Sequence, residues 1–182
     1  MPEQLVRRVV VTGHDERRRS RVALDTMVSG QSIAVVPGMA VSQIWGADEP
    51  LHYPDNGAKP RYANLMPPMN GCRLLEFELP ARMGLVTAAP NAAAGANEGA
   101  FKSAEIARML SSDRPGMHRT ATMDMIIVLQ GACVLELDEG EVTLRTGDVL
   151  IESGTMHAWQ NPFDEPCRLL AAIVGARNDL CD

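Results

Sequence analysis

The sequence predicts an all-β protein of the jelly-roll type. Short apolar runs of strand length recur along the chain, polar or glycine-containing turns separate them about every eight to twelve residues, and no alternation of strands with helices suggests a parallel sheet. From His118 onward the pattern is almost continuous. We therefore expect antiparallel strands that close into a sandwich or barrel, in one structural domain overall.

The composition narrows the classes of function. The chain has 182 residues, which is long enough to bury a core without disulfides, and a net charge of −6, which disfavours a nucleic-acid partner. No window approaches the roughly 18 apolar residues that a membrane span needs, so we expect a cytoplasmic protein without membrane contact. The four cysteines form no CxxC pair, a pattern that indicates neither a zinc ribbon nor a redox dithiol.

The N-terminal part is expected to form a β extension. Val6–Gly30 has two β-rich runs around a polar turn, which predicts a hairpin, and Met39–Trp45 is a further candidate strand. Gly46–Pro68 contains five prolines, so it is expected to be a long ordered loop. On this basis residues 1–70 form a hairpin and loop that pack on the barrel, and residues 71–182 form its core.

The middle of the chain combines a strand with an insertion. Cys72–Leu79 alternates as a strand does, and Pro80 ends it. Within the insertion 83–110, an alanine-rich stretch is followed by apolar residues at helical spacing over 100–110, which predicts a short helix that Asn97 caps. Because long insertions in compact domains are often functional, this segment is a candidate lid.

Polar side chains gather on two strand faces of the C-terminal half. Residues two apart share a strand face, which groups the first set: His118, Thr120, Thr122 and Asp124. The face then turns apolar at Ile126 and Val128, as expected where a barrel mouth grades into its packed floor. The second set lies in SGTMHAWQN, where the same parity groups His157, Trp159 and Asn161.

These two segments resemble the paired motifs of the cupin superfamily, which are small jelly-roll barrels. The first motif is His, any residue, His, three or four residues, Glu, six residues, Gly, and the chain has His118, Thr120, Asp124 and Gly131 at these positions. The second ends in Gly, two residues, His, three residues, Asn, which Gly154, His157 and Asn161 match. The resemblance implies a cupin barrel, with an N-terminal β extension and a short helix before the first motif.

The departures from the motifs bear on metal binding. Metal-binding cupins hold a transition metal with the histidines and glutamate of the first motif and the histidine of the second. Here Thr120 replaces one histidine, Asp124 replaces the glutamate, and Glu152 stands where the second motif has proline. His118, Asp124 and His157 remain as two imidazoles and one carboxylate, a set that suits iron(II) and accepts manganese, nickel or zinc. Because Asp is one methylene shorter than Glu, Asp124 reaches less far toward a metal than the glutamate of the motif. We therefore expect a divalent metal as an optional cofactor.

Two assignments of roles stay open. With a metal, His118 and His157 are ligands and Asp124 is a ligand or an acceptor beside them. Without a metal, His157 is the best general acid or base and Asp124 orients it, with His118 as a further catalytic candidate. Four other side chains are expected to line the pocket: Thr120, Thr122, Met125 and Trp159.

Three functions follow from this reading. The first is a small-molecule enzyme of cupin type that acts on a small, partly apolar organic acid, ketone or phenol by lyase, isomerase or oxygenase chemistry. The second is a non-catalytic cupin that binds a small metabolite without metal. The third, a purely structural protein, is disfavoured because polar groups buried without a use cost free energy. We also expect a homodimer that pairs through strand edges or the N-terminal hairpin.

Overall fold

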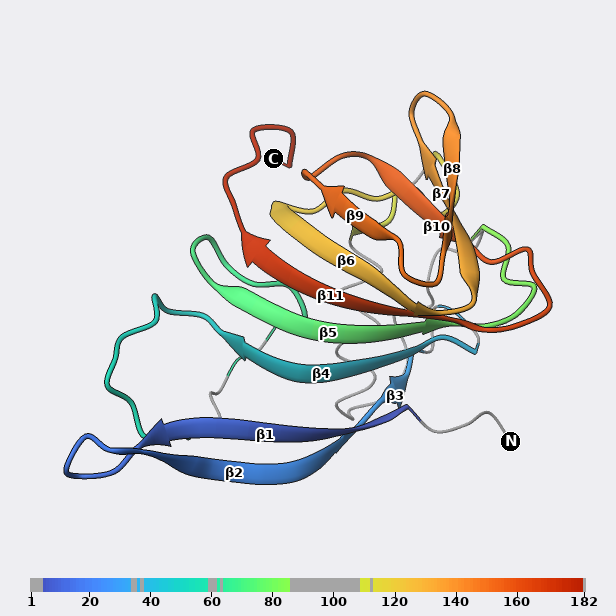
Figure 1. Ribbon diagram of the computed structural model, residues 1–182. Coiled ribbons are helices and arrows are strands. Elements are labelled where there is room, and N and C mark those ends of the chain that lie inside the picture. Colours follow the sequence, from blue (N-terminus) through green and yellow to red (C-terminus); the bar gives the residue numbers. More distant parts are fainter. Residues whose placement is uncertain are drawn as a thin grey trace.

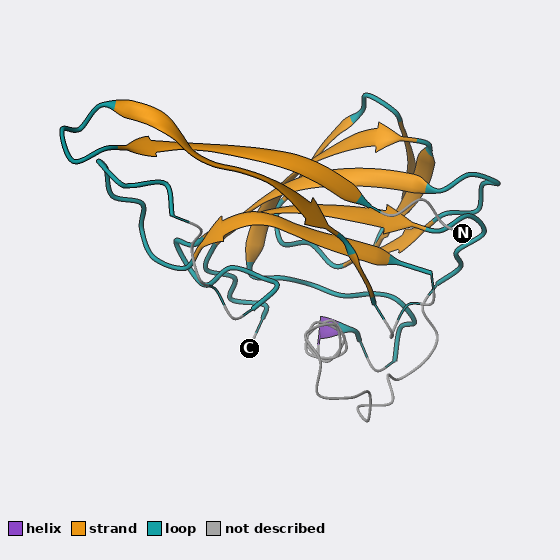
Figure 2. Ribbon diagram, turned by 90° about the horizontal axis from the view of Figure 1, so that it is seen from below, coloured by secondary structure: helices purple, strands orange, loops and turns teal. Residues whose placement is uncertain are grey.

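The computed structural model describes residues 5–33, 36, 38–58, 62, 64–85, 109–111 and 113–181. These residues form a nearly all-β structure, as Figures 1 and 2 show. The strands in chain order are β1 (Val6–His14), β2 (Ser20–Ser29), β3 (Gln31–Ser32), β4 (Ala40–Ala47), β5 (Cys72–Leu79), β6 (Thr122–Gln130), β7 (Ala132–Leu137), β8 (Glu141–Arg145), β9 (Val149–Glu152), β10 (His157–Gln160) and β11 (Cys167–Gly175).

Two antiparallel sheets enclose the core. The larger has the order β3-β4-β5-β11-β6-β9 and the smaller has the order β10-β7-β8. Leu75, Ile126 and Ile173 of the larger sheet and Cys133 and Leu135 of the smaller belong to one buried apolar cluster, so the sheets pack face to face. This arrangement confirms the expected cupin jelly roll.

Alternation along the strands determines which face looks inward. In β6, Thr122, Asp124 and Ile126 are buried while Met123 and Met125 between them are exposed. The same alternation runs through β11, and the registers of β6 and β5 on either side of it keep the inward residues together. A shift of one residue in the strand pairing would turn the apolar side chains to the outer face, so the apolar pattern fixes the register.

The N-terminal hairpin forms a separate two-stranded sheet of β1 and β2, which Figure 1 shows beside β4. Arg7 of β1 donates two hydrogen bonds, of 2.6 and 2.7 Å, to the carboxylate of Glu76 on β5, and the Glu76 side chain is fully buried. At the hairpin tip, a side chain on Gly13 would begin 2.4 Å from the backbone of Asn56. The hairpin is therefore docked at both of its ends.

A buried arginine fixes the long loop between β4 and β5. Arg73 donates to the carbonyl oxygens of Ala47, Cys72 and Asn64 at 2.9 to 3.2 Å and to Asp48 at 2.5 Å. Its guanidinium also lies 4.4 Å from the centre of the Tyr62 ring. Because planar guanidinium serves several acceptors at once, one side chain holds both ends of the loop.

Most of the expected helix falls outside the described residues. Of the range 100–110, Met109 is helical and Leu110 pairs as an isolated bridge with His118. The candidate cap Asn97 and most of the candidate lid also lie outside that part of the chain. No helix among the described residues is long and apolar enough to cross a membrane.

Candidate active site

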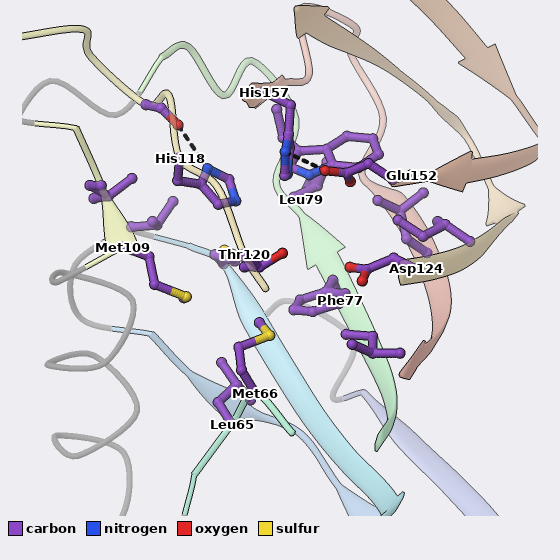
Figure 3. A pocket seen from close by; sticks show the side chains of 18 of the residues that line it. Leu65, Met66, Phe77, Leu79, Met109, His118, Thr120, Asp124, Glu152 and His157 are labelled. Atoms are coloured by element: carbon purple, nitrogen blue, oxygen red, sulfur yellow. Dashed lines mark hydrogen bonds and ion pairs between the residues drawn. The ribbon is translucent and has the colours of Figure 1, made fainter. Parts of the chain in front are cut away.

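A cavity of about 100 Å³ lies between the two sheets of the barrel (Figure 3). Its wall is largely apolar and includes four methionines, Phe77 and Trp159, while its polar groups come from five side chains: His118, Thr120, Asp124, Glu152 and His157. Figure 3 shows these five groups facing a common space. An apolar cavity with a few convergent polar groups is the usual form of a small-molecule site.

The polar groups reach the cavity from β6, β9 and β10 and from the segment that precedes β6. Asp124 points inward from β6, and Glu152 ends β9 directly opposite, since the two residues are register partners. His157 begins β10. The backbones of His118 and His157 exchange two hydrogen bonds, of 2.8 and 3.0 Å, which bring their rings to a centroid distance of 4.2 Å.

Backbone carbonyls set the orientation of both imidazoles. Nδ1 of His118 lies 3.0 Å from the carbonyl oxygen of Gly116, and Nδ1 of His157 lies 2.9 Å from that of Thr155. A carbonyl oxygen only accepts, so each Nδ1 carries a hydrogen and donates it. Both rings line the cavity, and because Nδ1 of each ring is engaged, Nε2 is the nitrogen left for a ligand.

Glu152 contacts only one of the two cavity histidines among the described residues, and the pKa values of the two imidazoles shift in opposite directions. Its Oε1 forms an ion pair with Nδ1 of His157, and both side chains are buried. Burial lowers the pKa of His157, but the ion pair with Glu152, the Thr155 carbonyl and the charge of Asp124 outweigh it, so the pKa is raised. Burial and the neighbouring His157 lower the pKa of His118 to about 4, against the bond to Gly116.

Asp124 and Glu152 can each accept a further hydrogen bond. Asp124 is 9% exposed and Glu152 is 4% exposed. Oδ1 of Asp124 and Oε2 of Glu152 are buried and have no hydrogen-bond partner among the described residues. Burial raises the pKa of Asp124 to about 6, and the charge of Glu152 adds to the rise, whereas Thr122 and His157 oppose it.

The structure brings most of the sequence-derived candidates together. His118, Asp124, His157, Thr120 and Trp159 all line the cavity.

Two candidates for the cavity lining lie elsewhere. Thr122 is buried beside the wall, with its hydroxyl 2.7 Å from that of Thr120. The expectation for Met125 is wrong, because it lies on the opposite face of β6 from Asp124 and is 37% exposed.

Glu152 is the residue that sequence reasoning missed. It occupies the contact to His157 that was expected of Asp124. The signal was present in VLIE, since Leu150 and Glu152 share a parity opposite to the exposed Val149 and Ile151. A charged residue at an inward position next to the second motif marks a site.

In the part of the chain that the structure describes, no three His, Cys, Asp or Glu side chains are grouped to hold a metal ion. Thr120, at the position of the missing histidine, has its hydroxyl engaged with Thr122. A metal bound by His118, Asp124 and His157 therefore stays a prediction.

A family model matches part of the chain. Residues 107–173 match the family model of the cupin domain, Cupin_2, and contain both polar strand segments. These residues are the part of the chain that is similar to the cupin domain, and they include all five polar groups of the cavity.

The curated relatives match over short segments. The oryzines biosynthesis cluster protein J of Aspergillus oryzae is 45% identical over 49 residues, which are 26% of this chain and 27% of that protein. The cupin-domain-containing oxidoreductase srdB of Neurospora crassa is 41% identical over 63 residues, 34% of this chain and 32% of its own length. The matches thus span about a third or less of these relatives.

Among solved structures, a predicted oxalate decarboxylase from Thermotoga maritima aligns with 81% of this chain and 93% of its own, at 15% identity and a TM-score of 0.44. A putative ethanolamine utilization protein Q from Salmonella typhimurium aligns with 94% of this chain and 98% of its own, at 8% identity and a TM-score of 0.46.

Proposed function

We propose that this protein is a small-molecule enzyme that moves protons by general acid–base catalysis, in a reaction of the isomerase or lyase type. One observation carries the proposal. Two imidazoles that line one cavity have their Nδ1 atoms bonded to backbone carbonyls, and among the described residues His157 alone of the two has a carboxylate partner. Paired titratable groups whose environments separate their pKa values are the usual sign of an acid and a base.

The geometry assigns a role to each ring. His118, whose pKa is lowered, is neutral at pH 7, so its Nε2 lone pair is free to take a proton from a carbon next to a carbonyl group. The ion pair with Glu152 raises the pKa of His157, which favours its imidazolium form, and that form donates its Nε2 proton to the carbonyl oxygen. The C–H electron pair becomes the C=C bond of the enol. Return of the proton from His118 to carbon completes an isomerisation. In a dehydration His118 gives its proton to a β-hydroxyl, which leaves as water, while His157 takes back the proton of the enol oxygen.

The rest of the cavity supports this chemistry. Apolar side chains such as Leu79, Ile126 and Leu169 exclude water around the rings, which strengthens the electrostatic effect of Glu152 on His157. Enolisation between two imidazoles needs no metal ion, and no step here depends on one. A divalent metal at His118, Asp124 and His157 stays a prediction, which metal analysis of the purified protein checks.

Solvent exchange tests the proposal without knowledge of the natural substrate. Three ketones serve as probes in D2O: α-hydroxyacetophenone, acetophenone and cyclohexanone. Proton NMR follows the loss of the α-hydrogen. We expect the protein to accelerate exchange in at least one probe, and His118→Gln and His157→Gln each to lower the rate by about 100-fold or more.

His52→Gln provides the matched control. His52 lies in the exposed loop between β4 and β5, away from the cavity wall, so this variant should exchange at the wild-type rate. Saturable binding of a probe without accelerated exchange would contradict catalysis and favour the alternative, a cupin that binds a metabolite without transforming it. Exchange that survives both active-site substitutions would contradict the assigned roles.

A further inference from the structure

The two unpartnered carboxylate oxygens restrict what the cavity can accept. Oδ1 of Asp124 and Oε2 of Glu152 belong to side chains that are more than nine-tenths buried, and both side chains line the cavity. A buried acceptor without a donor has lost its bonds to water without replacement, and the cost in free energy is larger when the acceptor is charged. A ligand that supplies donors to these oxygens recovers this free energy.

The charge of the wall points in the same direction. Among the described residues that line the cavity there is no lysine or arginine, and the imidazole of His157 is already paired with Glu152. A carboxylate brought into this space would meet two acidic side chains and no free cation. Like charges at short range in an apolar site are strongly unfavourable.

We propose that the ligand of this cavity carries hydrogen-bond donors, as hydroxyl or ammonium groups on a small apolar body, and that organic acid anions are rejected. The inference rests on the proposed function in taking this cavity as the substrate site. It narrows the substrate class to alcohols, phenols, hydroxyketones or amines. The methionines and aromatic rings of the wall contact the apolar body, and the two carboxylates bind the donors.

Three probes of one shape measure this preference. Benzyl alcohol, benzylamine and benzoate share a phenyl ring and differ in their donors and charge. Calorimetric titration at pH 7.5 should give at least tenfold tighter binding of benzyl alcohol or benzylamine than of benzoate. The alcohol and amine arms show whether a neutral or a cationic donor is favoured.

Substitution of Asp124 and Glu152 tests whether these two carboxylates cause the preference for probes with hydrogen-bond donors. Asp124→Asn and Glu152→Gln each keep the shape of the side chain and replace an acceptor oxygen with a donor NH2. Each variant should lose affinity for the donor probes about tenfold and gain affinity for benzoate. Glu141→Gln, on the exposed surface of β8, makes the same chemical change outside the cavity and should leave all three affinities unchanged. Circular dichroism confirms that each variant is folded.

Three results would overturn the inference. Benzoate could bind as tightly as the donor probes, or the probe preference could survive both substitutions. Alternatively, stoichiometric Mn²⁺ or Zn²⁺ binding that both substitutions abolish would show that a metal satisfies these oxygens. Failure of the proposed function is a separate outcome, because donor selectivity without proton exchange leaves the inference standing, while proton exchange without selectivity removes only the inference.

Discussion

Two single residues, His118 and Asp124, have opposite effects on stability over one range of pH. The pKa of His118 falls from 6.5 to about 4 on folding, so the unfolded chain binds a proton first as the pH drops, and stability falls toward pH 4. The pKa of Asp124 rises from 3.8 to about 6, so the folded chain keeps its proton longer as the pH rises, and stability falls toward pH 6. Each effect amounts to about 3 kcal/mol, and they nearly cancel.

Single substitutions should separate the two contributions. Relative to wild type, the unfolding free energy of Asp124→Asn should rise by about 3 kcal/mol as the pH rises from 4 to 6.5. The reason is that the variant lacks the loss of stability that Asp124 causes over this range, while the gain from His118 remains. His118→Asn should lose a similar amount over the same range. Urea unfolding at four pH values measures both differences. Parallel stability curves for the three proteins would show that neither group is desolvated as the structure describes.

His157 acts in a different pH range. Its pKa is raised on folding, so its contribution to stability is complete below pH 6.5 and is lost as the pH rises through the pKa of the folded state. The imidazolium that the proposed mechanism needs and the stability that the ion pair provides therefore disappear together at alkaline pH. This range lies above the one in which His118 and Asp124 oppose each other.

Among the strand elements, β6 and β9 present an unusual outer surface. Their outward positions carry large apolar side chains that are 37–63% exposed: Met123, Met125, Ile127, Val149 and Ile151. Met125 is the register partner of Ile151, and Ile127 that of Val149, so the side chains form one continuous patch. β9 is also the edge strand of the larger sheet. Contiguous apolar patches of this kind mark contact sites.

We predict that a second copy of the chain covers this patch. The patch carries no charge, so it is complementary to itself in a two-fold pairing. The homodimer expected from the sequence is then formed through the face of β6 and β9. Sedimentation velocity at micromolar concentration should show a dimer for wild type and a monomer for Met125→Lys combined with Ile151→Lys. A wild-type monomer, or a dimer that the double substitution leaves intact, would contradict the prediction.

The elements also show what a sequence can and cannot predict. Alternation within one strand needs only local information. The sequence therefore predicted the strand Cys72–Leu79, the strands that follow His118, and the inward direction of Asp124. The docking of the hairpin depends on Arg7 and Glu76, which are 69 residues apart, and the loop geometry depends on Arg73. Such long-range contacts leave no periodic signal in the chain.

For the whole molecule, motif spacing identified the fold and most of the cavity. The two cupin segments placed His118 and His157 in one site because the barrel topology brings them together. The chemistry was harder to derive, since it depends on which carboxylate contacts which imidazole. Glu152 stands at a motif position where proline is expected, so a template read from the motif passes over it. Electrostatic roles follow from distances of a few ångströms.

Long-range ¹H–¹⁵N NMR correlation of the histidine ring nitrogens, recorded from pH 4 to 9, tests the central claim most directly. Of the two cavity rings, we expect His118 to be neutral at pH 7 with its hydrogen on Nδ1, assigned by the loss of its signals in His118→Gln, and His157 to keep its second proton to a higher pH than an ordinary histidine. Glu152→Gln should lower the pKa of His157. Two rings that titrate together near pH 6.5, or a His118 with its hydrogen on Nε2, would contradict the acid–base pair.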